Sequence, residues 1–243
     1  TADDDRPPSL DRIISSYTRT MRTGGRDGQS ELEVRFGTVG PKIPRQSYLA
    51  VIQKLQQRGY ANTATLNRLS ILPERSDIRI EISSLPAITI FCDSNEVKDI
   101  AAHLRATSKT MLASGGKTIA KETFKDFNFR ISLSLEKDVT STEGTKQLLQ
   151  RLDKTPRVYR LLHRYTFSKD DAPFKFELSS VKQSKPTRSS FINSGTTRVA
   201  QSYEIEIELD NNKIKGVYTD KRLATELRDA IKLVLSGLQG SNY

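Results

Sequence analysis

The sequence has few of the residues on which many active sites depend. Cys92 is the only cysteine, and His103 and His163 are the only histidines. A single cysteine excludes an intrachain disulfide and a thiolate-rich zinc site. Two histidines argue against a histidine-based metal site and against a Ser-His-Asp triad. The low cysteine content fits an intracellular location.

Long apolar runs are also lacking. No run approaches the ~20 residues that a membrane-spanning helix needs, so we expect no membrane partner. The N-terminal stretch TADDDRPPSL has no apolar core of the kind that signal peptides carry. What the chain does have is positive charge, with a net charge of +10 and an isoelectric point near 9.7. This balance favours a polyanionic partner.

Hydrophobic periodicity predicts five helices and nine strands among the 243 residues. The helices are expected over 10–22, 45–58, 94–107, 143–153 and 220–237. The strands are expected over 30–37, 63–72, 77–83, 87–91, 117–124, 127–136, 157–168, 174–182 and 202–209. The segment 183–199 is predicted to be a long, polar and basic loop between the last two strands.

Two of these strands carry rows of glutamates. In ELEVRFG, Glu31, Glu33 and Arg35 alternate with apolar residues, and YEIEIEL repeats the pattern with Glu204, Glu206 and Glu208. Side chains of a strand alternate between its two faces, so each segment has one charged face and one apolar face. Several other strands, such as FNFRISLSLE, follow the same scheme.

The charged faces have two possible environments. In an antiparallel sheet with one face packed and one in water, they would simply be solvated. The predicted amphipathic helices favour a different arrangement, because they need the apolar faces of the strands to bury their own. If the sheet closes into a barrel with the helices outside, the charged faces line the interior.

A charged interior of this kind has a chemical use. Carboxylates within a few Å of one another repel, and each needs a raised pKa, a basic neighbour or a cation. Magnesium and similar hard cations prefer carboxylate oxygens, and arginine matches the oxygens of phosphate. The sequence therefore predicts metal-assisted phosphoryl transfer, with the phosphates held by Arg35, Arg79, Arg130, Arg160, Arg164 and Lys175.

These motifs resemble those of a known family. ELEVRFG near the start, YEIEIEL near the end, and RISLSLE, RLLHRYTFS and FKFELSSVK between them resemble the triphosphate tunnel metalloenzymes. The chain is most similar to the metal-dependent RNA 5′-triphosphatases of mRNA capping, the type found in fungi, protists and large DNA viruses. The motif sequences are most like those of the triphosphatase domain of a large-virus capping enzyme. The resemblance implies an α+β fold: a closed antiparallel β-barrel of about eight strands, the triphosphate tunnel, with amphipathic helices outside.

The resemblance also implies roles for single residues. Glu31, Glu33 and Glu208 are expected to ligate the metal, Mg²⁺ or Mn²⁺. Glu204 and Glu206 would hold water at the metal or orient basic neighbours, and Glu136 would position the attacking water. Phosphate contacts are expected from Arg79, Arg130, Arg160, Arg164 and either Lys117 or Lys121. Leu162 and Glu177 depart from the pattern, because a basic residue and an aspartate are more usual there.

Alternative roles for some of these residues stay open. Arg160 and Arg164 could form a surface patch for phosphate or RNA, and Glu136 could pair with an arginine. An ion pair between Lys175 and Glu177 is the alternative for those two side chains.

The implied substrate is 5′-triphosphate RNA, with nucleoside triphosphates as further substrates. Residues 1–243 would form one RNA triphosphatase domain, the N-terminal part of a larger enzyme with guanylyltransferase and methyltransferase partners. The location would be a viral factory, the host cytoplasm or the virion for a viral protein, and the nucleus for a cellular one. Lys182, Lys185, Arg188 and Arg198 of the basic loop would guide the RNA.

Two other classes of function remain open at this point. The first is a tunnel enzyme that acts on tripolyphosphate, thiamine triphosphate or ATP. Its relatives usually have a lysine where this chain has Arg35. The second is an RNA-binding capping module without catalysis.

Overall fold

The computed structural model describes residues 10–23, 28–38, 40–112, 121–124 and 128–238, and its main feature is one antiparallel sheet. Its strands are β1 (Gln29–Phe36), β2 (Ala61–Pro73), β3 (Ile78–Ile82), β4 (Leu104–Met111), β5 (Lys121–Phe124), β6 (Phe129–Asp138), β7 (Arg157–Ser168), β8 (Phe174–Gln183) and β9 (Ser202–Leu209). The helices are α1 (Leu10–Thr23), α2 (Arg45–Gln57), α3 (Leu85–Ser94), α4 (Glu143–Gln150), α5 (Asn211–Ile214) and α6 (Asp220–Leu238). Short 3₁₀ helices are η1 (Val97–His103), η3 (Leu152–Lys154), η4 (Ile192–Ser194) and η5 (Thr196–Arg198).

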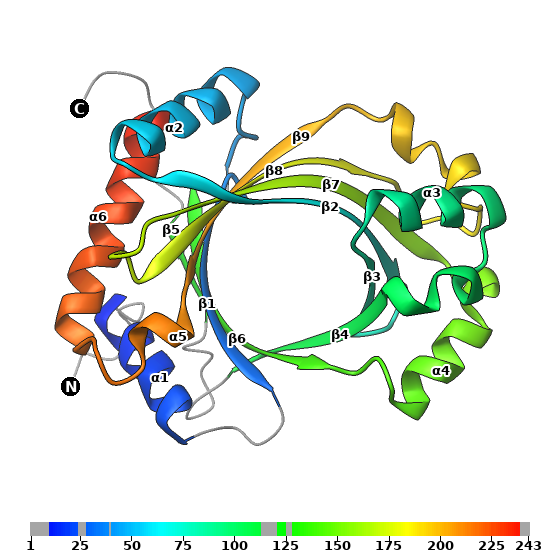
Figure 1. The fold of residues 1–243 in the computed structure, drawn as a ribbon, viewed down its shortest axis with the longest axis horizontal. Helices are drawn as coiled ribbons and strands as arrows, with labels where there is room; N and C mark the ends of the chain where they lie inside the picture. Colours follow the sequence, from blue (N-terminus) through cyan, green and yellow to red (C-terminus); the bar gives the residue numbers. More distant parts are fainter. Residues whose placement is uncertain (1–9, 24–27, 39, 113–120, 125–127, 239–243) are drawn as a thin grey trace, which may run out of the picture.

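The sheet closes on itself. The strands follow the order β1-β9-β8-β7-β2-β3-β4-β6, and β6 pairs again with β1, so eight strands form a ring. Figure 1 shows the ring end-on, with β1 and β6 opposite β3. The short β5 is not part of this ring. It pairs with the first residues of β6, on the same edge of β6 that β4 occupies further along. The closed antiparallel barrel predicted from the sequence is confirmed.

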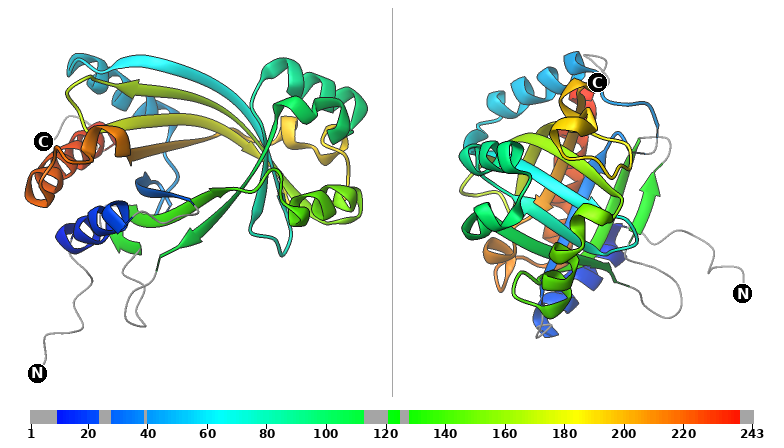
Figure 2. Two further views of the ribbon diagram at one scale, coloured as in Figure 1. Left: turned by 60° about the horizontal axis from the view of Figure 1, so that its bottom comes forward. Right: turned by 90° about the vertical axis from the view of Figure 1, so that its right-hand side faces the viewer.

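Two groups of helices cover the outside of the barrel. The apolar faces of β1, β6, β8 and β9 form a core with α1, α2 and α6, and Val34 and Ile207 of this core are fully buried. On the opposite side, β2, β3 and β7 pack against α3, η1 and α4. The two groups lie on either side of the ring in Figure 1, and the right-hand view of Figure 2 shows α3 and α4 in front of the strands. Since the helices take the apolar faces, the polar faces turn inward.

None of the described helices has both the length and the apolar character required to span a lipid bilayer.

Two predicted elements are wrong. The strand expected over 87–91 lies within α3, which Ser84 caps by accepting a hydrogen bond from the backbone N–H of Ala87. Its apolar residues follow a helical spacing and bury Ile88 and Phe91 against the barrel. The helix expected over 94–107 is instead the short η1 followed by β4, whose pairing with β3 and β6 outweighs the local pattern. Of the strand expected over 117–124, residues 121–124 form β5 and the rest lies outside the described residues.

Candidate functional site

The barrel encloses a polar cavity of about 450 Å³. Its walls come from every strand of the ring, because period-two alternation turns one side chain in two toward the centre. Ten of the residues predicted for the site line it: Glu31, Glu33, Arg35, Arg79, Glu136, Arg160, Arg164, Lys175, Glu206 and Glu208. The two ring arginines Arg160 and Arg164 thus face the tunnel, and the alternative of a surface patch is wrong for them.

The two glutamate rows lie side by side. β1 and β9 are neighbours in the ring, and their register places Glu33 opposite Glu208 and Arg35 opposite Glu206. Like charges directly across a strand pair repel, so the pairing of Glu33 with Glu208 is unfavourable without a cation or a proton. The predicted meeting of the N-terminal and C-terminal motifs is therefore present in the fold.

Three of these carboxylates are held in environments that disfavour their charge. Burial raises the pKa of Glu31 and of Glu33, and Glu206 adds to the rise at Glu33. Burial and the nearby Glu177 raise the pKa of Glu208 to about 8. An all-oxygen group of crowded, desolvated carboxylates suits a hard divalent cation, which would relieve both effects.

Lys109 lies between two of the three carboxylates, and sequence reasoning missed it. Its ammonium is 2.9 Å from Glu31 Oε2 and 3.4 Å from Glu33 Oε1. Partial desolvation lowers the pKa of Lys109, but the two glutamates outweigh it and raise the pKa. Within the described residues, no group of three or more His, Cys, Asp or Glu side chains is arranged so that it could hold a metal ion. The positive charge at this position is supplied by the lysine.

Glu206 behaves in the opposite way to its neighbours. It is buried, but the cations around it, led by Arg35 and Arg164, hold its pKa below the ordinary value. Arg35 Nη2 lies 2.7 Å from Glu206 Oε1, and this carboxylate is the main cause of a raised pKa at Arg35. Glu206 is therefore an ionised counterion that fixes arginines, which is one of the two roles considered for it.

Two further carboxylates serve as counterions. Glu204 forms an ion pair with Arg160 and does not line the cavity. Glu177 is 2.9 Å from Arg164 and 3.3 Å from Lys175, so the expected alternative of a Lys175–Glu177 ion pair is present. Lys175 also lies 3.7 Å from Glu208. Glu177 thus ties together two side chains that were predicted to contact phosphate.

Arg79 stands apart from this network. It lines the cavity, and it makes no hydrogen bond or ion pair with any part of the chain that the structure describes. Partial desolvation and the cations Arg160, Arg35 and Arg68 lower its pKa, with Glu81 acting the other way. An arginine that has other arginines nearby, and no ion pair within the described residues, is a favourable binding site for an anion.

Glu136 lies on β6 at the edge of the carboxylate group. Arg105 Nη2 is 3.5 Å from Glu136 Oε1, and Arg105 Nε is 3.4 Å from Asp138 Oδ2. The alternative reading of Glu136 as an arginine partner is therefore present in the structure, and its role toward water stays a prediction. Arg105, together with Arg68 and Glu81, belongs to the lining that the sequence did not predict.

The remaining predicted residues are placed less centrally. Arg130 lies opposite Arg35 in the β1–β6 register, and its Nε is buried without a hydrogen-bond partner. Lys121 of β5 is in register with Ser132, and Lys117 lies outside the described residues. Leu162 lines the cavity between Arg160 and Arg164, so the apolar departure from the family pattern is real.

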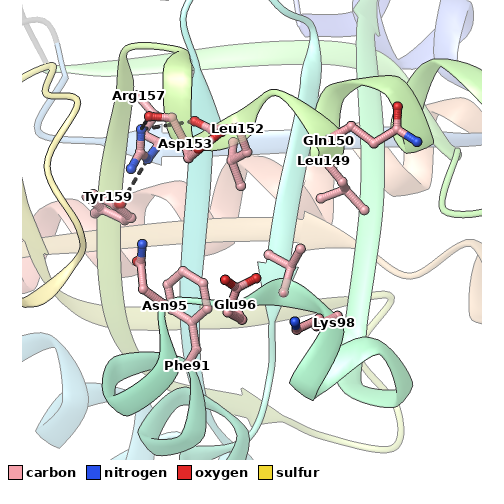
Figure 3. Close-up of a pocket in the computed structure, with 11 residues that line it drawn as sticks. Phe91, Asn95, Glu96, Lys98, Leu149, Gln150, Leu152, Asp153, Arg157 and Tyr159 are labelled. Atoms are coloured by element: carbon pink, nitrogen blue, oxygen red, sulfur yellow. Dashed lines mark hydrogen bonds between the residues drawn. The ribbon is translucent and has the colours of Figure 1, made fainter.

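A larger cavity of about 550 Å³ lies outside the barrel, between α3–η1 and α4–η3. Figure 3 shows it, with Phe91, Leu149 and Leu152 among its lining residues and Arg157 at one edge. The Arg157 side chain already donates to Tyr159 Oη and to backbone carbonyls, including those of Leu152 and Ser189. The only other cation in its lining is Lys98, so this cavity has no cluster of arginines comparable to that of the tunnel.

Comparisons with known proteins agree with this geometry. Residues 124–235 match the family described as "mRNA capping enzyme, beta chain". The resemblance inferred from the motifs is thereby confirmed. A search of curated proteins finds no match.

Two solved structures share the fold over nearly the whole chain. The RNA triphosphatase domain of a trifunctional mimivirus mRNA capping enzyme is 15% identical, with a TM-score of 0.61 over 93% of this chain and 99% of that one. The S. pombe Pct1 RNA triphosphatase is also 15% identical, with a TM-score of 0.54 over 95% of this chain and 94% of that one. The fold class predicted from the sequence is confirmed by both.

Proposed function

We propose that this chain is a metal-dependent RNA 5′-triphosphatase, which removes the γ-phosphate from 5′-triphosphate RNA and leaves a 5′-diphosphate end for capping. One observation carries the proposal. A closed barrel brings crowded carboxylates and Arg79, which has no partner among the described residues, to the same polar cavity. The capping-enzyme match and the RNA triphosphatase folds support the same reaction.

The carboxylates of Glu31, Glu33 and Glu208 are the residues that would hold Mg²⁺ or Mn²⁺. When bound there, such an ion supplies neutralisation of phosphate charge and polarisation of a phosphoryl oxygen. Lys109 places a second positive charge beside Glu31 and Glu33, and a phosphate entering the cavity would offer its ammonium a new partner. The lysine thereby exchanges carboxylate contacts for a phosphate contact.

The arginines bind the rest of the triphosphate. Arg79 offers all its donors, while Arg35 and Arg160 are oriented by Glu206 and Glu204. Guanidinium groups held in this way need little reorganisation when the anion arrives, which is how a site stabilises charge in a transition state. Arg130, Arg164, Lys175 and Lys121 or Lys117 complete the proposed phosphate contacts.

Glu136 is proposed to orient the attacking water. It is tied to Arg105, which fixes its carboxylate at the edge of the cavity beside β1, since Gln29 and Glu136 are in register. A carboxylate in that position accepts a hydrogen bond from water and aligns it for attack on the γ-phosphorus.

The test is release of the γ-phosphate from 5′-triphosphate RNA by the purified protein. We expect release that depends on added Mg²⁺ or Mn²⁺ and produces a 5′-diphosphate end. The matched variants are Glu33→Gln, within the carboxylate group, and Glu74→Gln, an exposed residue of the β2–β3 turn. Equal rates for both variants, or release without a divalent ion, would refute the proposal.

A second candidate rests on the same cavity. Most of the lining is charged and suited to phosphate, so nucleoside triphosphates or tripolyphosphate could be hydrolysed as well. Comparing kcat/KM for RNA, ATP and tripolyphosphate separates the two functions. A module that binds RNA without catalysis would give RNA binding and no phosphate release with any of them.

The wider context is also a proposal. The protein would act as one RNA triphosphatase domain, forming the N-terminal part of a longer enzyme that carries guanylyltransferase and methyltransferase activities. Tethering raises the local concentration for passing on the diphosphate end. Its place of action would be the viral factory, host cytoplasm or virion if it is viral, and the nucleus if it is cellular.

A further inference from the structure

The two open ends of the barrel differ in charge. Because all neighbours in the ring are antiparallel, one end is formed by the last residues of β1, β2, β4 and β8 and the first residues of β3, β6, β7 and β9. We call it the basic mouth. The opposite end, the acidic mouth, holds the first residues of β1 and β8 and the last residues of β6 and β9.

Two stretches without a single acidic residue build much of the basic mouth. Residues 34–73 contain no Asp or Glu, and neither do residues 178–203. The first stretch supplies the loop between β1 and α2, with Lys42, and the first residue of α2, Arg45. The second supplies the loop between β8 and β9, with Lys185, Arg188 and Arg198. All five side chains are exposed. None forms an ion pair within the described residues.

The two stretches meet in the fold. The ring of Tyr48, in α2, lies 4.7 Å from that of Tyr203, at the start of β9, measured between centroids. The first loop is also fastened to β6, because Gly40 N donates to Asn128 Oδ1 at 2.6 Å and Asn128 Nδ2 donates to Pro41 O at 2.8 Å. The two acid-free stretches therefore touch where α2 packs on the start of β9.

The second loop is equally well fixed. Lys182 Nζ donates to Thr197 O at 2.8 Å, and Arg157 Nη2 donates to Ser189 O at 3.0 Å. These contacts hold Arg198 near the end of β8 and Arg188 near the start of β7. A preordered basic loop loses less conformational entropy when a polyanion binds.

The acidic mouth differs from the basic mouth in having several carboxylates close to the strand ends. Asp138 ends β6, Asp210 follows β9, and Asp170 and Asp171 lie in the turn between β7 and β8. Of the described connections at the basic mouth, the β2–β3 turn has Glu74 and Asp77, and the segment before β7 has Asp153. Lys169 and Arg105 also lie at the acidic mouth, so charges of both signs offset one another there, whereas the exposed cations of the basic mouth attract a polyanionic chain.

The candidate metal ligands and several arginines of the barrel lie toward different ends. Glu31, Glu136 and Glu208 lie on the parts of their strands near the acidic mouth. Arg35, Arg130 and Arg160 lie toward the basic mouth, at the end of β1 and near the starts of β6 and β7. A triphosphate with its γ-phosphate at the carboxylates would thus have its nucleoside end directed toward the basic mouth.

We propose that the RNA chain leaves the tunnel through the basic mouth and lies across the surface formed by Lys42, Arg45, Lys185, Arg188 and Arg198. The inference rests on the proposed function for the orientation of the triphosphate, whereas the surface itself binds any single-stranded RNA. Binding there is by phosphate contacts and is independent of base sequence.

The test measures binding of a short, unstructured RNA with a 5′-hydroxyl end, which is not a substrate, by fluorescence anisotropy over a range of salt concentrations. The variant K42Q/R45Q/R198Q removes three charges from the surface. The variant K221Q/K232Q removes charges from exposed positions of α6 and is the control. We expect the first variant to bind roughly tenfold more weakly and its salt slope to fall by about 2, since each single-strand phosphate contact contributes about 0.7. The control should bind as the wild type does.

A second measurement joins the surface to catalysis. With hydrolysis as readout, K42Q/R45Q/R198Q should lose more kcat/KM toward 5′-triphosphate RNA than toward ATP, which has no chain beyond the mouth. Equal binding by the two variants, or equal losses for RNA and ATP, would overturn the proposal. Because 5′-hydroxyl RNA is never cleaved, the binding result holds even if the protein has no triphosphatase activity.

Discussion

Single residues in the tunnel fall into two electrostatic groups, although they share one cavity. Glu206 is stabilised in its ionised form by Arg35 and Arg164, whereas Glu31, Glu33 and Glu208 are destabilised in theirs. The first group holds the arginines in place. The second is ready to receive positive charge. Substitutions in the two groups should therefore have opposite effects on stability.

Glu208→Gln should stabilise the metal-free protein at neutral and alkaline pH. The pKa of Glu208 is raised to about 8 in the folded protein, against an ordinary value of 4.5. The folded state thus binds more protons than the unfolded state between these values, and its stability falls as pH rises from about 4.5 to about 8. Urea unfolding with a chelator should show that Glu208→Gln removes this decline, worth on the order of 2 kcal/mol at pH 8 after allowance for solvent screening.

The control for this experiment is Glu74→Gln, which changes an exposed acid and should leave the pH profile of stability as in the wild type. A decline of the same size in Glu208→Gln and the wild type would show that Glu208 is already ionised in the folded protein.

Arg79→Gln should separate stability from activity. Since Arg79 has no partner within the described residues and its charge is disfavoured, its loss should leave the melting temperature unchanged or raise it. A charge-assisted contact to phosphate is worth about 1.5–3 kcal/mol, so kcat/KM should fall roughly tenfold to a hundredfold. Steady-state kinetics and thermal unfolding of the same preparation give both values. A large drop in melting temperature, or full activity, would contradict the assignment.

Among the elements, those with strict alternation were predictable and those that depend on tertiary pairing were not. β1, β6 and β9 alternate apolar and polar residues along their length, so their inward faces could be read directly, as could α2 and α6 from their apolar stripes. β4 has the sequence LRATSKTM, which lacks a continuous apolar face. It is a strand because β3 and β6 take both its edges. Lys109 was missed for that reason.

The candidate site shows the same division. The glutamate rows of β1 and β9 were predicted because each has its own local pattern. The counterion pairs, such as Glu204 with Arg160, depend on which strands are neighbours and on how far each side chain reaches across the ring. A single sequence does not contain that register. The apolar α3 was mistaken for a strand because a short apolar run is compatible with either structure.

The buried guanidinium of Arg157 connects three elements: β7, η3 and the β8–β9 loop. It donates to Leu152 O at 2.9 Å, to Thr155 O at 2.9 Å and to Ser189 O at 3.0 Å. Arg157→Leu would leave these carbonyls unsatisfied, and we expect the free energy of unfolding to fall by about 3 kcal/mol or more. Arg151→Leu, at an exposed position just before η3, is the matched control and should change it by about 0.5 kcal/mol or less. Similar losses for the two variants in urea unfolding would refute this role.

For the molecule as a whole, divalent ions should act as ligands of the folded state. The unfolded chain does not gather Glu31, Glu33 and Glu208, so Mn²⁺ or Mg²⁺ should raise the melting temperature, with ~2.7 kcal/mol of stabilisation at a hundredfold excess over the dissociation constant. Glu31→Gln should remove most of this rise, whereas Glu74→Gln should keep it. A rise that is equal in Glu31→Gln and the wild type would place the ion elsewhere.

The closure of the barrel through β1 sets the order in which the chain can complete its fold. β1 lies between β6 and β9, and Glu33 pairs with Ser132 on one side and with Glu208 on the other. During synthesis β1 therefore cannot complete its pairing until β9 has emerged from the ribosome. Until then, the edge of β1 that pairs with β9 stays unpaired. Such non-local pairing makes folding slow. The exposed edge of a half-made ring is a place where a chaperone, or a second nascent chain, can bind before the protein closes.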